Sequence, residues 1–434
     1  MPAKKPTESS RKPLALNLTW TVAGRGLYAA VQWLIVVVIA NLGGSSEVGL
    51  LALALAIVTP IMVLSQLSLR VLKATDTTNC RGLADYFSLR LAATFVAAVL
   101  CIIVTLVSGF DSMTQHVILW VVVAKAIDNL SDVLYGFQLN LERHDVMSVS
   151  LMSRSMLALG VVAVAYSITH NLAIAVACQA LVWGGVLLVY DLPRTSEMLA
   201  DAGEGRRERF FDWNPVGWCR LARIGLPLGI SAFLASAITN VPRYFLEHDL
   251  GTNTLGLFAA MAYFVTFLSL AANAVAQTIA PRLGRALHEM DTGQFFRILS
   301  LLRVVAAGVT GAGVLLALAA GRPLIEMIYG EAFGEAAPLL PWIIVAGGLN
   351  SAAVFASYGM VAARRVYATL WALVFATTVC ILSCWFLIEW LGLLGAVLGW
   401  IAGLATQLAS FEFVLARHRS SLGPVRAEET APPT

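Results

Sequence analysis

The segment WVVVAKAIDNLSDVLYGFQL, Trp120–Leu139, decides how the rest of the chain is interpreted. It is twenty residues long, which is enough to cross a hydrocarbon core of about 30 Å as an α-helix. Near its middle it carries Lys125, Asp128 and Asp132, spaced i, i+3, i+7, so the three charges share one face of a helix. The segment therefore predicts a membrane-spanning helix with a charged stripe.

The composition of the whole chain supports a membrane setting. Of 434 residues, 59% are hydrophobic and 13% are charged, whereas soluble domains have roughly 45–50% apolar and about 25% charged residues. A hydropathy window of about 19 residues predicts an all-α integral membrane protein with twelve transmembrane helices, at residues 18–41, 47–69, 84–108, 116–139, 146–168, 172–190, 221–246, 254–279, 298–319, 338–360, 366–388 and 392–415.

The distribution of basic residues tests this topology, because Lys and Arg gather in cytoplasmic loops. The two termini and alternate loops hold 21 of the 29 basic residues, the opposite loops hold only Arg322, and the other seven lie within helices. This alternation predicts that both termini are cytoplasmic. The apolar run after Lys12 exceeds twenty residues, which predicts a retained first helix instead of a cleaved signal peptide.

The longest charged connection, Asp191–Trp218, divides the helices into six and six. No strong residue-level repeat relates the halves, so the expected duplication depends on helix count and topology. We expect two six-helix lobes around a central cavity. The predicted organisation is a cytoplasmic N-terminal tail (1–17), an N-lobe (18–190), a cytoplasmic inter-lobe linker (191–220), a C-lobe (221–415) and a cytoplasmic C-terminal tail (416–434).

The loops and cysteines offer little chemistry. The longest exterior loop, Gly321–Pro338, can include a short interfacial helix. The six cysteines lie in hydrophobic runs or expected cytoplasmic loops, so free thiols are expected. They are Cys80, Cys101, Cys178, Cys219, Cys380 and Cys384.

Polar residues inside the helices are the informative feature. A charge at the bilayer centre costs on the order of 2.5–3.5 kcal/mol, so it usually faces a protein interior or a water-filled cavity. Four further helices carry polar stripes at helical spacing. These are Asn17, Thr21, Arg25, Tyr28 and Gln32; Arg90, Thr94, Cys101, Thr105 and Ser108; Ser236, Asn240 and Arg243; and Thr266, Ser269, Asn273 and Gln277.

Two interpretations of the stripe at Lys125, Asp128 and Asp132 stay open. In the first, Lys125 and Asp128 neutralise each other as an internal ion pair. In the second, the charged stripe lines an aqueous route through the protein. Other basic residues lie within about two turns of a cytoplasmic end, where a long side chain can extend to the lipid headgroups. We expect that of Arg90, Arg154, Arg223 and Arg303.

If the stripes converge, the cavity they line is cationic and its guest is an anion. Phosphate and pyrophosphate suit Arg and Lys through charge-assisted hydrogen bonds. Trp33, Trp183, Tyr28 and Tyr263 could stack on sugar rings. The candidate substrate-binding residues are Arg25, Lys125, Arg243, Gln32, Asn240 and Asn273, and Asp128 and Asp132 are candidates for ion coupling.

Several segments resemble a known family. VIANLGGSSEVGLLALALAIVTPIMVLSQLSLRVLKATD, DYFSLRLAAT and SDVLYGFQLNLERHDVMSVSLMSRSMLALG are similar to the amino-terminal half of bacterial polysaccharide flippases. RPLIEMIYGEAFGEAAPLLPW resembles their connection between the ninth and tenth helices. These proteins transport O-antigen and exopolysaccharide repeat units and belong to the multidrug/oligosaccharidyl-lipid/polysaccharide exporter superfamily.

The resemblance implies a V-shaped pair of lobes that alternates access and moves an undecaprenyl-diphosphate-linked oligosaccharide across the bacterial inner membrane. Arg25, Lys125 and Arg243 would be counterparts of that family's cavity cations by position. Asp128 and Asp132 depart from a purely cationic cavity, so they either couple an ion gradient or tune Lys125. A polysaccharide polymerase and a chain-length regulator are the implied protein partners.

Two other functions remain for comparison. A multidrug exporter of the same superfamily would share the topology but favour an acidic cavity for cationic drugs. An enzyme acting on lipid-linked glycans would need a substantial loop or domain, and the chain has no HExxH, no paired CxxC and no GxxxxGK[ST] motif. We therefore expect no enzyme activity, no cofactor, no metal site and no nucleic-acid partner.

Overall fold

The computed structural model describes residues 14–76, 82–201, 210–289 and 291–422. All regular structure in these ranges is helical. In the first half lie α1 (Leu14–Ser65), α2 (Leu69–Ala74), α3 (Leu83–Val107), α4 (Ser112–Asn140), α5 (His144–Thr169), α6 (Leu172–Val186), the π-helical turn η2 (Leu187–Asp191) and α7 (Leu192–Asp201). The chain continues with α8 (Pro215–His288), α9 (Thr292–Tyr329), the 3₁₀ helix η3 (Glu331–Leu339), α10 (Leu340–Ala362), α11 (Val366–Leu391) and α12 (Leu393–Leu422).

The described helices agree with the expected membrane crossings. Within the described ranges, nine stretches are long and apolar enough to cross a membrane. Two of them, Thr19–Ala74 and Pro215–His288, bend at an internal glycine, so each holds two crossings. α4 is 29 residues long, or about 43 Å, which is enough to cross a membrane. It is not one of the nine apolar stretches, because three charges lie near its middle. The all-α, multi-pass fold class is confirmed, and the helices are consistent with twelve crossings.

Both bends have the same cause. Gly44 has φ 78° and ψ −173°, and Gly251 has φ 79° and ψ 171°, a conformation essentially restricted to glycine. The flanking sequences also match, since GSSEVGL begins at Gly44 and GTNTLGL begins at Gly251. This local likeness lies at the turn between the first two expected crossings of each half, and it does not amount to a strong residue-level repeat of the halves.

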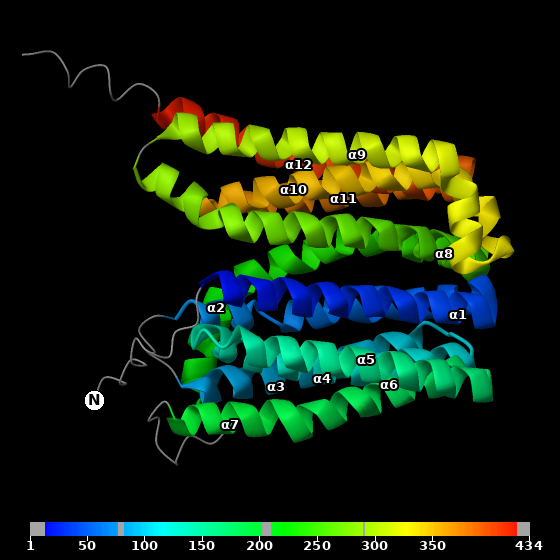
Figure 1. The fold of residues 1–434 in the computed structure, drawn as a ribbon, viewed down its shortest axis with the longest axis horizontal. Helices are drawn as coiled ribbons and strands as arrows, with labels where there is room; N and C mark the ends of the chain where they lie inside the picture. The colour runs from blue at the N-terminus through cyan, green and yellow to red at the C-terminus, as the bar shows by residue number, and fades with distance from the viewer. Residues whose placement is uncertain (1–13, 77–81, 202–209, 290, 423–434) are drawn as a thin grey trace, which may run out of the picture. The chain divides into compact units, whose positions relative to one another are not determined.

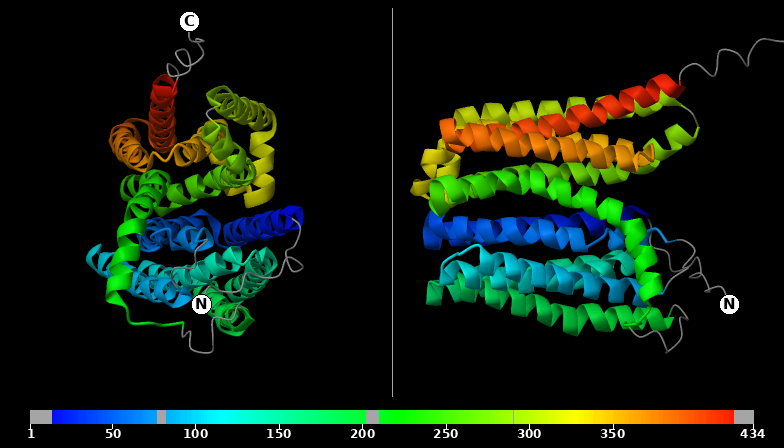
Figure 2. Two further views of the ribbon diagram at one scale, coloured as in Figure 1. Left: turned by 90° about the vertical axis from the view of Figure 1, so that its left-hand side faces the viewer. Right: turned by 180° about the vertical axis from the view of Figure 1, so that it is seen from behind.

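The chain forms two compact units, one ending at Ser236 and the other beginning at Ala237. In the first unit, α1, α3, α4, α5 and α6 lie side by side, and α7 continues α6 through η2 (Figures 1 and 2). α4 is the central helix, because it packs against α1, α2, α3, α5, α6 and α7. The charged stripe predicted from Trp120–Leu139 is therefore surrounded by the helices of its own unit.

Glycines allow two close approaches in the first unit. A Cβ at Gly225 would lie 2.4 Å from the Leu67 carbonyl oxygen, so the start of α8 packs directly on the turn after α1. A Cβ at Gly136 of α4 would lie 2.8 Å from the carbonyl oxygen of Arg70 in α2. Gly225 therefore serves helix packing, and Gly136 allows α2 to pack against the central helix.

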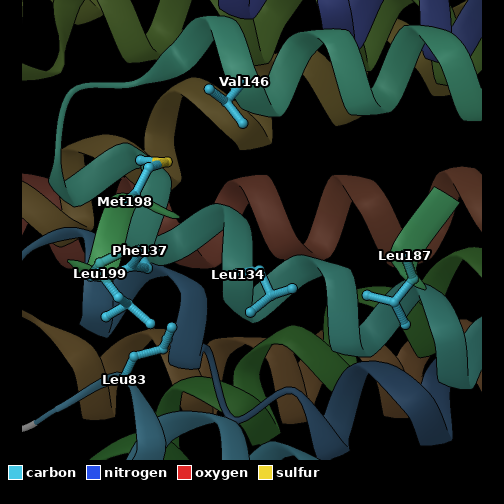
Figure 3. Close-up of a cluster of buried hydrophobic side chains, with 7 residues drawn as sticks. All are labelled: Leu83, Leu134, Phe137, Val146, Leu187, Met198 and Leu199. Carbon is cyan, nitrogen blue, oxygen red and sulfur yellow. The ribbon is translucent and has the colours of Figure 1, made fainter. Parts of the chain in front are cut away.

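An apolar cluster packs α3, α4, α5, η2 and α7 together in the first unit (Figure 3). Burying such side chains contributes on the order of 1.5–3 kcal/mol each, so the cluster fixes α7 and the π-helical turn onto α4. Its buried members are Leu83, Leu134, Phe137, Val146, Leu187, Met198 and Leu199.

In the second unit, α10 packs against α9 and α12, and α11 packs along α12. Gly399 and Gly403 make the second of these contacts possible, because a Cβ at either would meet Cys384 or Cys380 at 2.6 Å. The short helix predicted between Gly321 and Pro338 is present as η3. The five cysteines in the described ranges are free thiols, and Cys80 lies outside those ranges.

Candidate functional site

The central feature of the first unit is a pair of carboxylates on α4, one helical turn apart, each shared by two cations. Asp128 pairs with Arg154 and Lys125, and Asp132 pairs with Arg70 and Arg90. Each group of three charges therefore carries a net charge of +1. We call these two groups the Asp128 triad and the Asp132 triad.

In the Asp128 triad, the nearer cation comes from another helix. Arg154 of α5 donates from Nη2 to Asp128 Oδ1, whereas Lys125 Nζ lies 3.7 Å from Asp128 Oδ2. The Arg154 side chain is 2% exposed and that of Lys125 is 24% exposed. An isolated buried guanidinium would be costly, so Arg154 is the cation that neutralises Asp128, and Lys125 supplies the surplus charge.

Aromatic rings surround the Arg154 guanidinium. Its Cζ lies 4.8 Å from the ring centre of Trp183 (α6), 5.1 Å from that of Tyr28 (α1) and 5.9 Å from that of Tyr135 (α4). Cation–π contacts of this kind contribute about 0.5–2 kcal/mol each. Trp183 is buried against these cations, so the expectation that its ring is open to a sugar is wrong.

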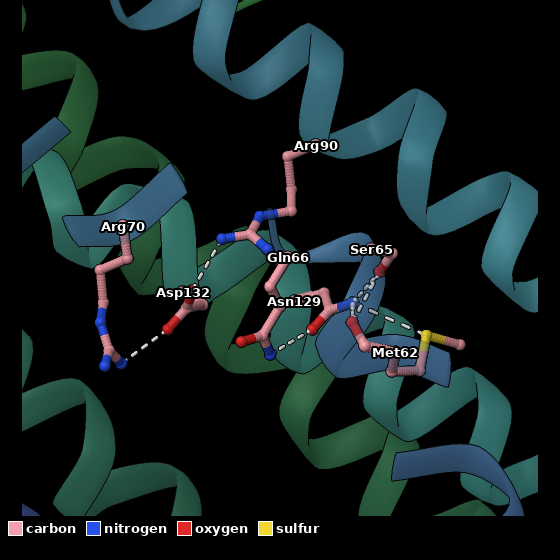
Figure 4. Close-up of polar contacts among 7 residues, drawn as sticks. All are labelled: Met62, Ser65, Gln66, Arg70, Arg90, Asn129 and Asp132. Carbon is pink, nitrogen blue, oxygen red and sulfur yellow. Dashed lines mark hydrogen bonds and ion pairs between the residues drawn. The ribbon is translucent and has the colours of Figure 1, made fainter. Parts of the chain in front are cut away.

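The Asp132 triad lies one turn closer than the Asp128 triad to the C-terminal end of α4, and its members are drawn in Figure 4. Arg70 Nη1 donates to Asp132 Oδ1 at 2.7 Å, and Arg90 Nη2 donates to Oδ2 at 2.8 Å. Arg90 is fully buried and Arg70 is 37% exposed. The arrangement repeats that of the Asp128 triad, with one buried arginine and one more accessible cation for each carboxylate.

Beside the Asp132 triad, an amide network joins α4 to the end of α1. Gln66 Nε2 donates to Asn129 Oδ1 at 2.9 Å, and Asn129 Nδ2 donates to Ser65 Oγ at 3.0 Å (Figure 4). The chain breaks out of α1 here, because Leu67 and Ser68 both have positive φ. The break turns α2 so that Arg70 points to α4.

The structure places the predicted site residues as follows. It brings Lys125 and Asp128 together in the Asp128 triad and places Asp132 in the other triad. Arg25 and Gln32 are half-buried on α1. Arg25 is close enough to His144 to interact with it electrostatically. Gln32 Nε2 is buried without a hydrogen-bond partner. Among the alternatives left open for the stripe, the internal ion pair is confirmed for Lys125 and Asp128.

The other predicted residues belong to the second unit. Arg243 Nη1 donates to Asn240 Oδ1 at 3.2 Å, and Arg243 Nε is buried without a hydrogen-bond partner. No described residue forms an ion pair with Arg243. Asn273 Nδ2 donates to the Ser269 carbonyl oxygen at 2.8 Å on the same helix.

The sequence analysis missed three of the four cations that pair with Asp128 and Asp132, namely Arg70, Arg90 and Arg154. Arg90 and Arg154 were expected to extend to lipid headgroups, and that expectation is wrong because both side chains are buried against carboxylates. Arg70 was not among the predicted site residues. The available signal was the pair of acids itself, since carboxylates inside a membrane helix require cationic partners.

The remaining predicted basic residues, Arg303 and Arg223, lie outside the two triads. Arg303 donates to Glu412 at 2.5 Å in the second unit, and Arg223 is exposed. Across the described residues, no group of three or more His, Cys, Asp and Glu side chains is arranged to hold a metal ion. The chemistry of this site is therefore the chemistry of arginine, lysine and carboxylate.

Comparison with known proteins shows similarity to proteins of polysaccharide biosynthesis. The family described as "Polysaccharide biosynthesis protein" matches residues 14–287. The capsular polysaccharide biosynthesis protein CapF of Staphylococcus aureus is 25% identical over 319 residues, which are 74% of this chain and 78% of CapF.

Solved structures show the same fold. The lipid II flippase MurJ, in an inward closed conformation, has a TM-score of 0.72 at 10% identity and covers 92% of this chain and 87% of its own. The Vibrio cholerae MATE transporter VcmN has a TM-score of 0.62 at 14% identity, covering 94% and 96%. A MOP superfamily transporter from Pyrococcus furiosus has a TM-score of 0.64 at 13% identity, covering 93% and 95%. This is a fold of multi-pass membrane transporters and flippases, not of enzymes.

Proposed function

Because the chain belongs to the polysaccharide biosynthesis protein family, we propose that it is a lipid-linked oligosaccharide flippase. It moves an undecaprenyl-diphosphate-linked repeat unit from the cytoplasmic to the outer leaflet of the bacterial inner membrane by alternating access. The translocated repeat unit is then used for the synthesis of O-antigen or exopolysaccharide. The proposal includes cytoplasmic termini, a six-and-six division at residues 191–220, and a polymerase and a chain-length regulator as partners.

The observation that carries this proposal is the surplus of cations around the two carboxylates of α4. Lys125, Arg154, Arg70 and Arg90 are four positive charges that share the two carboxylates of Asp128 and Asp132, a difference of two. Positive charges inside a membrane bundle are costly, and they mark binding sites and pathways. A diphosphate headgroup is the part of the substrate that such a surplus can bind.

The geometry divides the four cations into two roles. Arg154 and Arg90 are buried against their carboxylates and hold the helices together. Lys125 and Arg70 are the more accessible members of their triads, so a phosphate oxygen can replace a carboxylate oxygen as their partner. The carboxylate then keeps its buried arginine, and no isolated negative charge remains inside the protein.

Arg243 is the corresponding candidate in the second unit. Its guanidinium donates from Nη1 to Asn240, and its buried Nε can still donate. Gln32, with its buried and unpartnered amide nitrogen, is a candidate for binding a hydroxyl group of the sugar. Arg25, Asn240 and Asn273 stay in the proposed binding set, and Asp128 and Asp132 remain candidates for ion coupling.

The decisive experiment is deletion of the gene followed by measurement of lipid-linked oligosaccharide in each leaflet. A flippase deletion accumulates the lipid-linked unit on the cytoplasmic side. Unpolymerised units on the outer side would indicate a polymerase instead, and normal glycan with altered dye resistance would indicate a multidrug exporter. Complementation with K125A should fail, whereas complementation with K125R should restore export, because arginine keeps the charge.

A further inference from the structure

Asp191 is a buried carboxyl group that belongs to neither triad. It is the last residue of the π-helical turn η2, and its side chain is 0% exposed. The turn directs it into the contact between α4 and α5, where Ser131 Oγ donates to Asp191 Oδ2 at 2.8 Å. A widened helical turn of this kind occurs frequently at functional sites.

The surroundings of Asp191 provide hydroxyl groups instead of a cationic partner. Tyr135 Oη is 3.5 Å from Asp191 Oδ2 and makes a shorter contact, 2.8 Å, with Ser150 Oγ. Asp191 Oδ1 is buried and has no hydrogen-bond partner. In the described parts of the chain, no Lys, Arg or His forms an ion pair with Asp191.

The charged groups on each neighbouring element have other partners. Arg154 of α5 attracts Asp191 electrostatically, but its guanidinium donates its hydrogen bond to Asp128 of α4. On α7, Arg194 pairs with Glu197, and on α5, Asp145 pairs with Arg143. Asp191 therefore differs from Asp128 and Asp132, each of which is neutralised by arginine.

The apolar cluster of Figure 3 limits access of water to this carboxyl group. Leu187 lies in the same π-helical turn, Leu134 lies on α4 beside Tyr135, and both are at most 6% exposed. A carboxylate that faces only the hydroxyl groups of Ser131, Ser150 and Tyr135 in such a place is disfavoured, because no cation pairs with it, whereas a neutral carboxylic acid is tolerated. The ordinary way for a buried acid to meet this condition is to bind a proton.

We propose that Asp191 is a proton-binding site of the first unit, protonated in the conformation described and released to ionise when η2 moves away from α4. Tyr135 connects it to the Asp128 triad, because its hydroxyl approaches Asp191 and its ring contacts Arg154. Loss of the proton next to these groups adds a negative charge that competes with Asp128 for Arg154. A link between this step and substrate movement rests on the proposed function, whereas the proton site itself does not.

The test is infrared spectroscopy of the purified full-length protein in lipid nanodiscs at neutral pH. The carbonyl band of a protonated carboxylic acid, identified by its shift in heavy water, should be present in the wild type and reduced in D191N. S131A should shift this band, because it removes the hydrogen bond to Asp191. S153A is the matched control, since Ser153 Oγ donates to the Ser150 carbonyl oxygen, and it should leave the band unchanged.

Thermal unfolding gives an independent measurement. A carboxyl group that is neutral only when folded must ionise on unfolding at neutral pH, so the wild type loses stability as the pH rises and D191N does not share that loss. The advantage of D191N over wild type should therefore grow from pH 5 to pH 8. An identical carbonyl band in D191N and wild type, or stabilisation of wild type by sodium that D191N lacks, would overturn the proposal.

Transport separates this inference from the proposed function. If D191N loses the carboxylic acid band and still exports polysaccharide normally at every pH, the proton site stands and its coupling to transport is refuted. If the gene deletion leaves lipid-linked oligosaccharide distributed normally, the flippase function fails and the infrared result remains interpretable.

Discussion

Arg90 of α3 is fully buried and donates from Nη2 to Asp132 of α4 at 2.8 Å, although the two residues are 42 positions apart in the chain. Two of the Arg90 nitrogens, Nε and Nη1, are buried without a hydrogen-bond partner. Asp132 is therefore the group that makes the burial of Arg90 tolerable, and the pair fixes α3 against α4.

Removing the Asp132 carboxylate should destabilise the protein strongly. D132A leaves the buried Arg90 charge uncompensated, and the loss of one partner of a buried pair costs about 3–5 kcal/mol. Thermal unfolding in detergent measures the effect. The matched control is D145A, which removes the more exposed pair with Arg143 and should change stability by at most about 1 kcal/mol. Equal losses in the two variants would contradict the structural role of Asp132.

The buried arginine and the more accessible cation of a triad should separate stability from export. R154A should lower thermal stability, because it removes the buried partner of Asp128 and a contact with three aromatic rings. K125A and R70A should retain folding and lose export, since Asp128 and Asp132 keep their buried arginines. Thermal unfolding and surface polysaccharide are measured on the same variants. Wild-type export by K125A and R70A together would remove these residues from the proposed binding set.

Gly136 should not tolerate a side chain. Its Cβ would meet the Arg70 backbone at 2.8–2.9 Å, so G136A must push α2 away from α4 and move Arg70 from Asp132. Such overpacking costs about 1–3 kcal/mol, and export should fall with stability. Gly160 of α5 has open space around it, so G160A should stabilise by about 0.5–1 kcal/mol through helix propensity. A neutral G136A would show that the approach of α2 is not constrained.

Asp111 should stabilise the start of α4 in a pH-dependent way. It is the N-cap residue, and it accepts from the backbone nitrogens of Met113 and Thr114 at 3.0 and 3.3 Å. The hydrogen bond from the Thr114 hydroxyl, followed by those from the backbone, lowers the pKa of Asp111 below its ordinary value of 3.8. Its contribution is therefore present above pH 4 and is lost as the pH falls through the lowered value.

D111A should cost about 0.5–2 kcal/mol at neutral pH, the usual loss for an N-cap. Asparagine caps helices about as well as aspartate, so D111N should match wild type at neutral pH while lacking its loss of stability in acid. Thermal unfolding at several pH values compares the three proteins. An acid dependence in D111N equal to that of wild type would assign the effect to other groups.

Membrane insertion, helix positions and the charged face of α4 could be predicted from the sequence. These follow from hydropathy averaged over about 19 residues, from the distribution of Lys and Arg, and from helical spacing. All three are local or statistical properties of the chain. The bends at Gly44 and Gly251 were not predicted as a repeat, because the shared positive φ becomes evident only from the backbone.

The partners of the charges were decided by the tertiary structure. Asp132 meets Arg70 and Arg90 across 62 and 42 residues, and Asp128 meets Arg154 across 26. Position along a helix suggested that Arg90 and Arg154 reach the headgroups, but the packing of α3 and α5 on α4 offers each a buried carboxylate. Hydropathy determines how deep a residue lies in the membrane, whereas the direction of each side chain depends on which helices pack together.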